Sequence, residues 1–276
     1  MTQPGAPGQP PPTAPSDAEL AQIEADAVAF ARGAGEILLR YFRTNVEVEY
    51  KGTGKGDPVS VVDRESEQYL HAAIHAKYPG HSVLGEEGAN HDGDGSGYLW
   101  VVDPLDGTQE FVAGIPEWCI SIGLVENGQA VAGGVCNPAT GELFLGGVGL
   151  GVTLNGRAVA VGGRRDLQGA EVLASRSEVR RGEWGDKAAP FRVRPVGSVA
   201  YKLALVAAGL TDATWTLSPK HEWDVAGGAA LVLAAGGEIR TLDWEAPIFN
   251  LPHPWLSGLV ATSGGLSDAV RSYIGR

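Results

Sequence analysis

The stretch WVVDPLDGTQEF, residues 100–111, constrains the fold and chemistry of this chain more than any other segment. An apolar run of strand formers, Leu99 to Val102, leads into it. Asp103 and Asp106 then flank Pro104 and Leu105. Because proline fixes φ and has no amide donor, we expect the strand to stop at Pro104 and both carboxylates to converge at its exit.

Gly107 and Thr108 follow directly and favour an anion site beside the two acids. A glycine lets the backbone approach a ligand closely, and a helix that begins here would offer free N–H groups to a phosphate. Carboxylates for a hard cation beside an anion site are typical of metal-assisted phosphoryl transfer. The alternative is a capped strand-to-helix turn with solvated acids, and the motif alone is compatible with both.

The charge balance narrows the choice of partners. Over 276 residues, Lys+Arg 21 against Asp+Glu 33 gives a net charge of −12, which argues against nucleic acid or an anionic membrane as the main partner. No apolar run reaches membrane-spanning length and the N-terminus has no apolar signal region, so we expect a cytoplasmic protein. Cys119 and Cys136 are interpreted as small buried strand residues rather than as a disulfide or zinc site.

The hydrophobic pattern predicts a disordered Pro-rich tail and two structured halves. The tail covers 1–15, an N-terminal α+β half with the metal site covers 16–165, and a C-terminal α/β half with the substrate contacts covers 166–276. Antiparallel strands joined by Asn-Gly turns dominate the first half after the central stretch, and strands alternate with helices in the second. Helices are expected near 16–42, 63–78, 198–208, 224–235 and 267–274, with a single closing strand over 255–261.

Four further acids stand where predicted elements begin or end, so they could point into one cleft: Asp63, Glu86, Glu87 and Asp224. Each alone could equally be a helix cap or a solvated acid. Asp224 differs because it leads an apolar helix otherwise poor in charge, where an acid needs a partner. A cluster of such acids would repel and take up protons unless cations neutralised it, which links this composition to Mg²⁺.

Four motifs together resemble the inositol monophosphatase superfamily of Mg²⁺-dependent, lithium-sensitive phosphomonoesterases. They are Gly85-Glu86-Glu87, the D-P-L-D-G-T run of 103–108, W-D-V-A-G at 223–227, and the D-x-V-S-x-x-D element of 57–63. Their order and separations match the family over about 17–274. The resemblance implies an α/β fold, the α-β-α-β-α sandwich of the inositol monophosphatase and fructose-1,6-bisphosphatase type.

The resemblance also implies a role for each matching residue. Asp63 and Thr108 would orient and deprotonate the attacking water beside Asp106, and the N–H groups of Gly107 and Thr108 would receive the phosphate, with Asp224 facing the substrate. Glu87 would support this set or hold an outer metal. Two or three Mg²⁺ ions would be held by Glu86, Asp103, the carbonyl of Leu105, Asp106 and Asp224.

The metal motifs do not discriminate among the family's substrates. The residues that select the substrate are therefore expected in the second half of the chain. Leu217 stands where inositol monophosphatases place an acid for ring hydroxyls. The segments 175–178 and 218–224 are similar to those of bacterial 3′(2′),5′-bisphosphate nucleotidases, in which Arg176 and Lys220 would bind a second phosphate. We therefore favour cleavage of 3′-phosphoadenosine 5′-phosphate to AMP, with inositol-1-monophosphatase or a sugar bisphosphatase as alternatives.

Two other functional classes are to be compared with the sequence. A non-catalytic protein that binds a phosphometabolite is the competing class, but Thr108 and Asp63 are both present. The glycines of 146–151 have the wrong spacing for a dinucleotide-binding fingerprint, and we interpret them as turns. Because family members are commonly homodimers, the resemblance predicts a homodimer that acts on a small phosphorylated metabolite.

Overall fold

The computed structural model describes residues 17–44, 48–50, 58–88, 90–94, 97–184 and 188–275. The expected tail of 1–15 and Asp57 of the upstream motif lie outside these residues. Among the described helices, none is both long and apolar enough to cross a membrane.

A mixed sheet forms the centre of the N-terminal half, and its strands follow the chain in order from β3 to β9. The first two strands run parallel and every later neighbour is antiparallel. The expected hairpin is confirmed, since Asn127 and Gly128 have φ of 50° and 77°, as a type I′ turn requires. The strands are β3 (Ser82–Gly85), β4 (Tyr98–Asp106), β5 (Cys119–Glu126), β6 (Gln129–Asn137), β7 (Glu142–Gly147), β8 (Gly151–Leu154) and β9 (Arg157–Val159).

Strand β4 does not stop at Pro104, so that expectation is wrong. It continues to Asp106, and its pairing with β5 shifts register between Asp103 and Asp106. A proline fits a strand at such an irregularity because no ladder hydrogen bond is needed from it there. The two carboxylates still turn towards one place, as expected, but the cause is this local shift of register rather than an end of the strand at Pro104.

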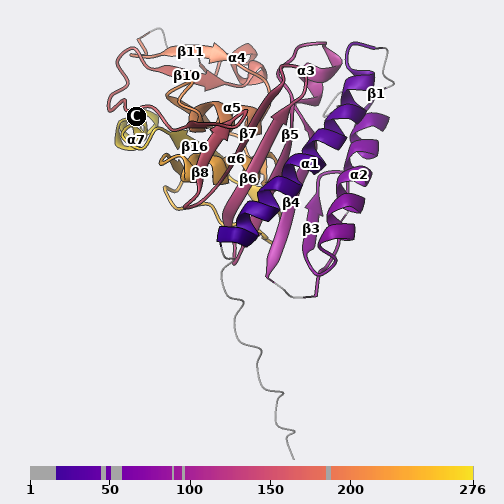
Figure 1. Cartoon of the computed structure of the whole chain (residues 1–276). Helices are drawn as coiled ribbons and strands as arrows, with labels where there is room; N and C mark the ends of the chain where they lie inside the picture. The colour runs from indigo at the N-terminus through magenta and orange to yellow at the C-terminus, as the bar shows by residue number, and fades with distance from the viewer. Residues whose placement is uncertain are drawn as a thin grey trace, which may run out of the picture.

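Helices α1 (Asp17–Tyr41) and α2 (Val61–Lys77) cover one face of this sheet (Figure 1). The inward face of α1 repeats at helical spacing through Ile23, Ala27, Phe30 and Ala34, which pack with strand residues in one buried cluster. The short strands β1 (Val48–Tyr50) and β2 (Pro58–Ser60) form a separate antiparallel pair just before α2.

A second, smaller sheet forms the C-terminal half in the order β11-β10-β12-β16-β14. Strand β10 is parallel to β11 and β12, whereas β16 is antiparallel to both its neighbours. The expectation of a single strand over 255–261 is wrong. The segment forms two strands, β15 and β16, and β15 pairs with β13 rather than with this sheet. The bounds are β10 (Glu171–Ala174), β11 (Arg192–Pro195), β12 (Ala213–Thr216), β13 (Lys220–His221), β14 (Glu238–Arg240), β15 (Trp255–Leu256) and β16 (Leu259–Thr262).

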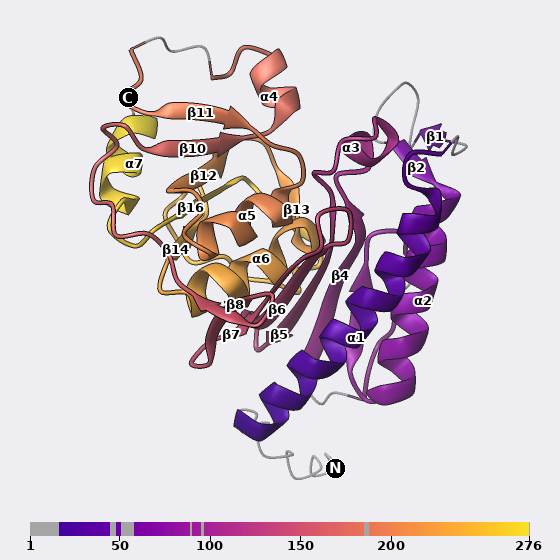
Figure 2. The same cartoon turned by 45° about the horizontal axis from the view of Figure 1, so that its top comes forward.

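Helices α5 (Val199–Ala207) and α6 (Glu222–Ala234) lie between the two sheets, and α7 (Ser267–Ile274) covers the outer face of the second (Figure 2). The α-β-α-β-α layering is therefore confirmed. Two short helices, α3 (Thr108–Val112) and α4 (Arg176–Arg180), follow strands β4 and β10. Arg176 is the first residue of α4.

The chain crosses from one sheet to the other between the end of β9 and the start of β10, near the expected boundary at 165/166. The division into two domains stays a prediction. Cys119 and Cys136 are both buried, unpaired strand residues, as expected.

Candidate active site

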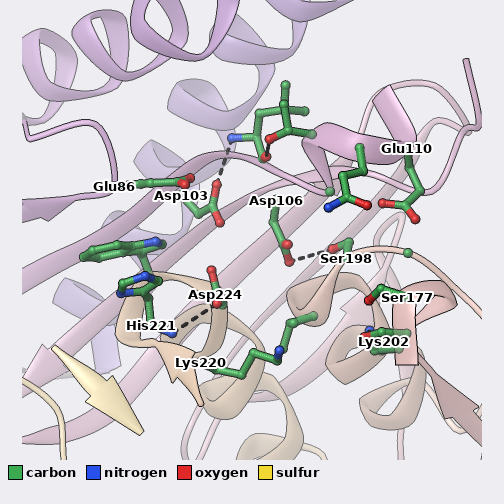
Figure 3. A pocket seen from close by; sticks show the side chains of 18 of the residues that line it. Glu86, Asp103, Asp106, Glu110, Ser177, Ser198, Lys202, Lys220, His221 and Asp224 are labelled. Carbon is green, nitrogen blue, oxygen red and sulfur yellow. Dashed lines mark hydrogen bonds between the residues drawn. The ribbon is translucent and has the colours of Figure 1, made fainter. Parts of the chain in front are cut away.

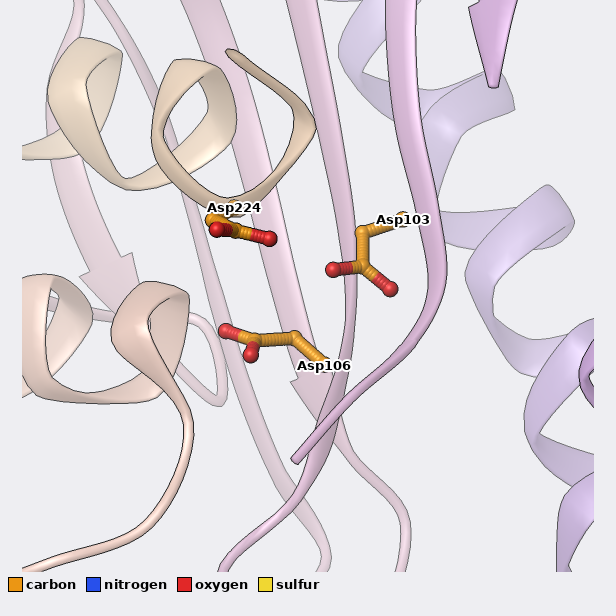
Figure 4. A group of neighbouring side chains, drawn as sticks. All are labelled: Asp103, Asp106 and Asp224. Carbon is orange, nitrogen blue, oxygen red and sulfur yellow. The ribbon is translucent and has the colours of Figure 1, made fainter. Parts of the chain in front are cut away.

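Three aspartates from two distant parts of the chain meet in one place (Figure 4). Asp103 and Asp106 come from the end of β4, and Asp224 from the first turn of α6. One carboxylate oxygen from each lies within 4.8 Å of the other two, and in the part of the chain that the structure describes no other group of three such ligands is as close.

Backbone and hydroxyl donors hold each aspartate in position. Asp103 accepts the Leu105 amide at 2.9 Å, and Asp224 accepts the His221 amide at 3.1 Å, which closes the start of α6. Asp106 reaches across the cleft to the N-terminus of α5, where it accepts the Ser198 hydroxyl at 2.7 Å and the Ala200 amide at 2.6 Å. The first sheet and both central helices are thus joined at the cluster.

The cluster carries more negative charge than its surroundings accommodate. Burial, with Glu86 and the other two aspartates, raises the pKa of Asp103 well above its usual range. Burial, followed by Asp106 and Glu86, does the same to the pKa of Asp224. Burial also raises the pKa of Asp106, although the donors from Ser198 and Ala200 oppose the change. Such a set of carboxylates favours either a proton or a cation in its midst.

The donor set fits Mg²⁺ and not a soft metal. All three converging side chains offer carboxylate oxygen, which hard divalent cations prefer. Glu86, at the end of β3, lines the same cleft and points towards the aspartates (Figure 3). Leu105, whose carbonyl is the expected backbone ligand, also lines the cleft, and this carbonyl accepts the Thr108 hydroxyl at 3.1 Å.

Thr108 and Asp63 lie together beside the cluster. The Thr108 hydroxyl is 3.3 Å from the Asp63 carboxylate, which is buried in the first turn of α2. A hydroxyl next to a carboxylate can position and deprotonate a water. The two residues matched by motif are therefore adjacent, although 45 positions separate them.

The glycine between the metal motif and α3 is required by geometry. Gly107 has φ of 96°, and a Cβ there would lie 3.0 Å from the carbonyl oxygen of Glu117. Its position at the cleft wall, next to Thr108, is where the phosphate was expected. Glu87 is half-buried after β3 and does not belong to the described lining of the cleft, so its supporting role stays a prediction.

The cleft has a volume of about 520 Å³ and is lined by cations as well as acids. Lys220, from β13, and Arg176 both line it, as the sequence suggested. Arg176, however, donates from Nε to Glu117 at 3.0 Å and from a terminal nitrogen at 2.5 Å, so its charge is already paired. Its contact with a second phosphate stays a prediction.

Lys202 is a functional candidate that the sequence analysis missed. It is only 4% exposed on α5, lines the cleft and donates to the Ser175 hydroxyl at 2.9 Å. Burial lowers the pKa of its ammonium, while Asp106 and Glu178 act in the opposite direction. A lysine inside an otherwise apolar helix, VAYKLALVA, was the signal that could have identified it.

An aromatic wall on the opposite side of the cleft was also missed. His221 stacks on Trp223 with centroids 4.2 Å apart and contacts Trp255 at 3.6 Å. Trp255 is half exposed. Leu217 does not belong to this wall, since it lines a separate cavity beside Trp215.

Comparisons with known proteins agree with the geometry. Residues 19–272 match the model of the inositol monophosphatase family. Nus factor SuhB of Pseudomonas aeruginosa is 37% identical over 226 residues, covering 76% of this chain and 82% of the relative. Inositol-1-monophosphatase of Mesorhizobium japonicum is 37% identical over 224 residues, covering 78% and 84%. The structure of inositol monophosphatase from Anabaena superposes with a TM-score of 0.77 at 28% identity, covering 93% and 96%.

Two of these three proteins are named inositol monophosphatase, and none of the three names supports the preference for a bisphosphate nucleotidase. The family match spans both sheets and every motif that supplies the aspartates and Thr108. The chain belongs to the inositol monophosphatase family of metal-dependent phosphomonoester hydrolases.

Proposed function

We propose that this cleft hydrolyses inositol 1-phosphate or a closely similar cyclitol monophosphate, with Mg²⁺ held by Glu86, Asp103, Asp106 and Asp224. The observation that carries the catalytic part is the convergence of three aspartates, two of them buried, beside the Thr108–Asp63 pair. The substrate is inferred from relatives named inositol monophosphatase.

Each residue of the cleft has a role in the proposed reaction that follows from its position. When bound, Mg²⁺ neutralises phosphate charge and makes water more acidic. Thr108 orients the attacking water, and Asp63, which accepts the Thr108 hydroxyl, takes up the proton. The Gly107 and Thr108 amides would bind the phosphate, and the donors from Ser198 and Ala200 favour the charged form of the Asp106 carboxylate against the effect of burial.

A phosphate-release assay tests this proposal. Inositol 1-phosphate should be hydrolysed only when Mg²⁺ is added to chelator-treated protein, and the rate should be lost again on chelation. Absence of Mg²⁺-dependent release from inositol 1-phosphate and from the other monophosphates offered would favour the non-catalytic binding protein instead.

Cleavage of a nucleoside 3′,5′-bisphosphate is the second candidate, and the cations of the cleft favour it. Lys202 and Lys220 both line the cleft, and an exposed Trp255 ring could stack on a base. Leu217, in place of an acid for ring hydroxyls, lines another cavity. A second phosphate would need cationic partners of this kind away from the metals.

The two substrates are distinguished by comparing kcat/KM for inositol 1-phosphate and for adenosine 3′,5′-bisphosphate. A charge-assisted contact is worth about 1.5–3 kcal/mol, or about one to two decades of binding. If the bisphosphate is the substrate, it should be preferred, and Lys220→Ala or Arg176→Ala should erode the preference about tenfold or more while Arg157→Ala, on an exposed strand end, should not. A preference for inositol 1-phosphate that survives these substitutions supports the first candidate.

The expectation of no nucleic-acid partner rests only on the net charge of −12. The relative from Pseudomonas aeruginosa and several others are named Nus factor SuhB, which is not an enzyme name. We keep a small phosphorylated metabolite as the proposed partner because the cleft and its acids account for that ligand directly.

A further inference from the structure

Three of the chain's six histidines gather at one place outside the cleft. His71 and His75 stand one turn apart on α2, and His91 belongs to the segment after β3. Ring centroids are 6.2 Å apart for His71–His75, 6.2 Å for His71–His91 and 4.7 Å for His75–His91. None of the three lines the catalytic cleft.

We propose that His71, His75 and His91 form a second metal site, which takes a transition ion such as Zn²⁺ through three imidazole nitrogens. The site is separate from the carboxylate cluster and selects a different ion, since imidazole suits Zn²⁺, Ni²⁺ and Cu²⁺ whereas Mg²⁺ prefers oxygen.

The spacing of the rings suits a single ion. A zinc–nitrogen bond is about 2.0–2.1 Å, and a ring centre lies about 1.2 Å behind its nitrogen, so two imidazoles on one tetrahedral ion have centroids about 5 Å apart. The observed separations of 4.7 and 6.2 Å lie on either side of this value. The three nitrogens do not all lie within 4.8 Å, as the aspartate oxygens do, so the rings must turn inward as the ion binds.

A buried nitrogen also needs a partner here. Nε2 of His71 is screened from solvent and accepts or donates no hydrogen bond. A buried polar atom in this condition is unfavourable, and coordination would satisfy it.

The third ligand is held firmly by the backbone. The His91 amide and carbonyl exchange hydrogen bonds with Val83 of β3 at 3.0 and 2.9 Å. His75 is exposed on α2, which gives an ion a route of entry and the ring freedom to turn. A bound ion would therefore tie α2 to the segment that follows β3, and this segment begins at Glu86.

The test is zinc binding by the full chain, stripped with chelator and kept in saturating Mg²⁺ to occupy the carboxylate cluster. Isothermal titration with Zn²⁺ should find one site in the micromolar range or tighter. His75→Gln and His91→Gln should each weaken it at least tenfold, whereas His253→Gln, at an exposed histidine outside the group, should leave it unchanged. Thermal unfolding without Zn²⁺ should be the same for His75→Gln and wild type, because the side chain is exposed.

A Cu²⁺ probe identifies the ligands independently of catalysis. Its electron paramagnetic resonance spectrum should show nitrogen hyperfine splitting in wild type and in Asp106→Asn, and lose it in His75→Gln. Equal Zn²⁺ affinity in wild type and His75→Gln, millimolar binding only, or a spectrum without nitrogen coupling would each overturn the site. None of these outcomes depends on phosphatase activity.

Discussion

At the scale of single residues, Asp106 has the most demanding position in the cluster. Its carboxylate lies beside those of Asp103 and Asp224, and it also accepts hydrogen bonds from Ser198 and Ala200 at the start of α5. Asp106→Asn keeps the shape and removes one charge, so Mg²⁺ binding should weaken. We expect kcat to fall about 100-fold or more, since metal charge stabilisation is worth several kcal/mol. Circular dichroism should confirm the fold, and near-normal activity at limiting Mg²⁺ would disprove the assignment.

A substitution at Thr108 can distinguish a role in water activation from a role in substrate binding. If its hydroxyl acts with Asp63 on the attacking water, Thr108→Ala should lower kcat by about 100-fold with little change in KM. Thr108→Ser keeps the hydroxyl and is the matched control, so it should recover most of the rate. A tenfold rise in KM at constant kcat would instead make Thr108 a substrate-binding residue.

At the scale of elements, the position of Asp224 depends on how closely α6 packs on the sheet. A Cβ on Gly133 of β6 would lie 2.1 Å from the carbonyl oxygen of Gly227 in α6. Gly133→Ala must therefore push the helix away from the sheet and cost about 1–3 kcal/mol of stability. Because Asp224 stands in the first turn of that helix, Mg²⁺ affinity should fall too.

Gly163→Ala is the control for that packing, because a Cβ there meets nothing within 4 Å and its φ is not in the left-handed region. It should change stability by less than about 0.5 kcal/mol. Urea unfolding and Mg²⁺ titration of both variants measure the effect. Loss of stability with unchanged Mg²⁺ affinity would show that the helix start is fixed by its own contacts, such as those of His221.

Elements with strong local signals were predictable from the sequence, and elements defined by distant partners were not. The Asn-Gly hairpins and the apolar spacing of α1 are local properties and are confirmed. Strand β13 is two residues long and exists because Trp255 and Leu256 pair with it, so nothing within its own sequence indicates it. The motifs likewise located the aspartates. The sequence marks Lys202 as an unusual lysine in an apolar helix, but its place at the cleft depends on how α5 packs beside the distant strand β4.

At the scale of the whole molecule, the two halves share a core. One buried cluster joins Leu99 and Val135 of the first sheet to Leu203 and Ala229 of the central helices. The active site is built in the same way, with β4 on one side and α6 on the other. Since neither half completes the core or the aspartate cluster alone, we expect the two sides of the 165/166 boundary to fold as one unit.

The last prediction follows from this shared core. A fragment of 166–276 would expose the face of α6 that packs on the first sheet, and burial of apolar area is the main source of stability. We expect the fragment to unfold without a cooperative transition, whereas the full chain shows a single one by circular dichroism and by intrinsic fluorescence. Mg²⁺ should raise the midpoint of the full chain, because its ligands come from both halves and bind only when these are joined. A sharp thermal transition of the isolated fragment would establish it as a domain in its own right, and the aspartate cluster would then be an interface between two independently folding units.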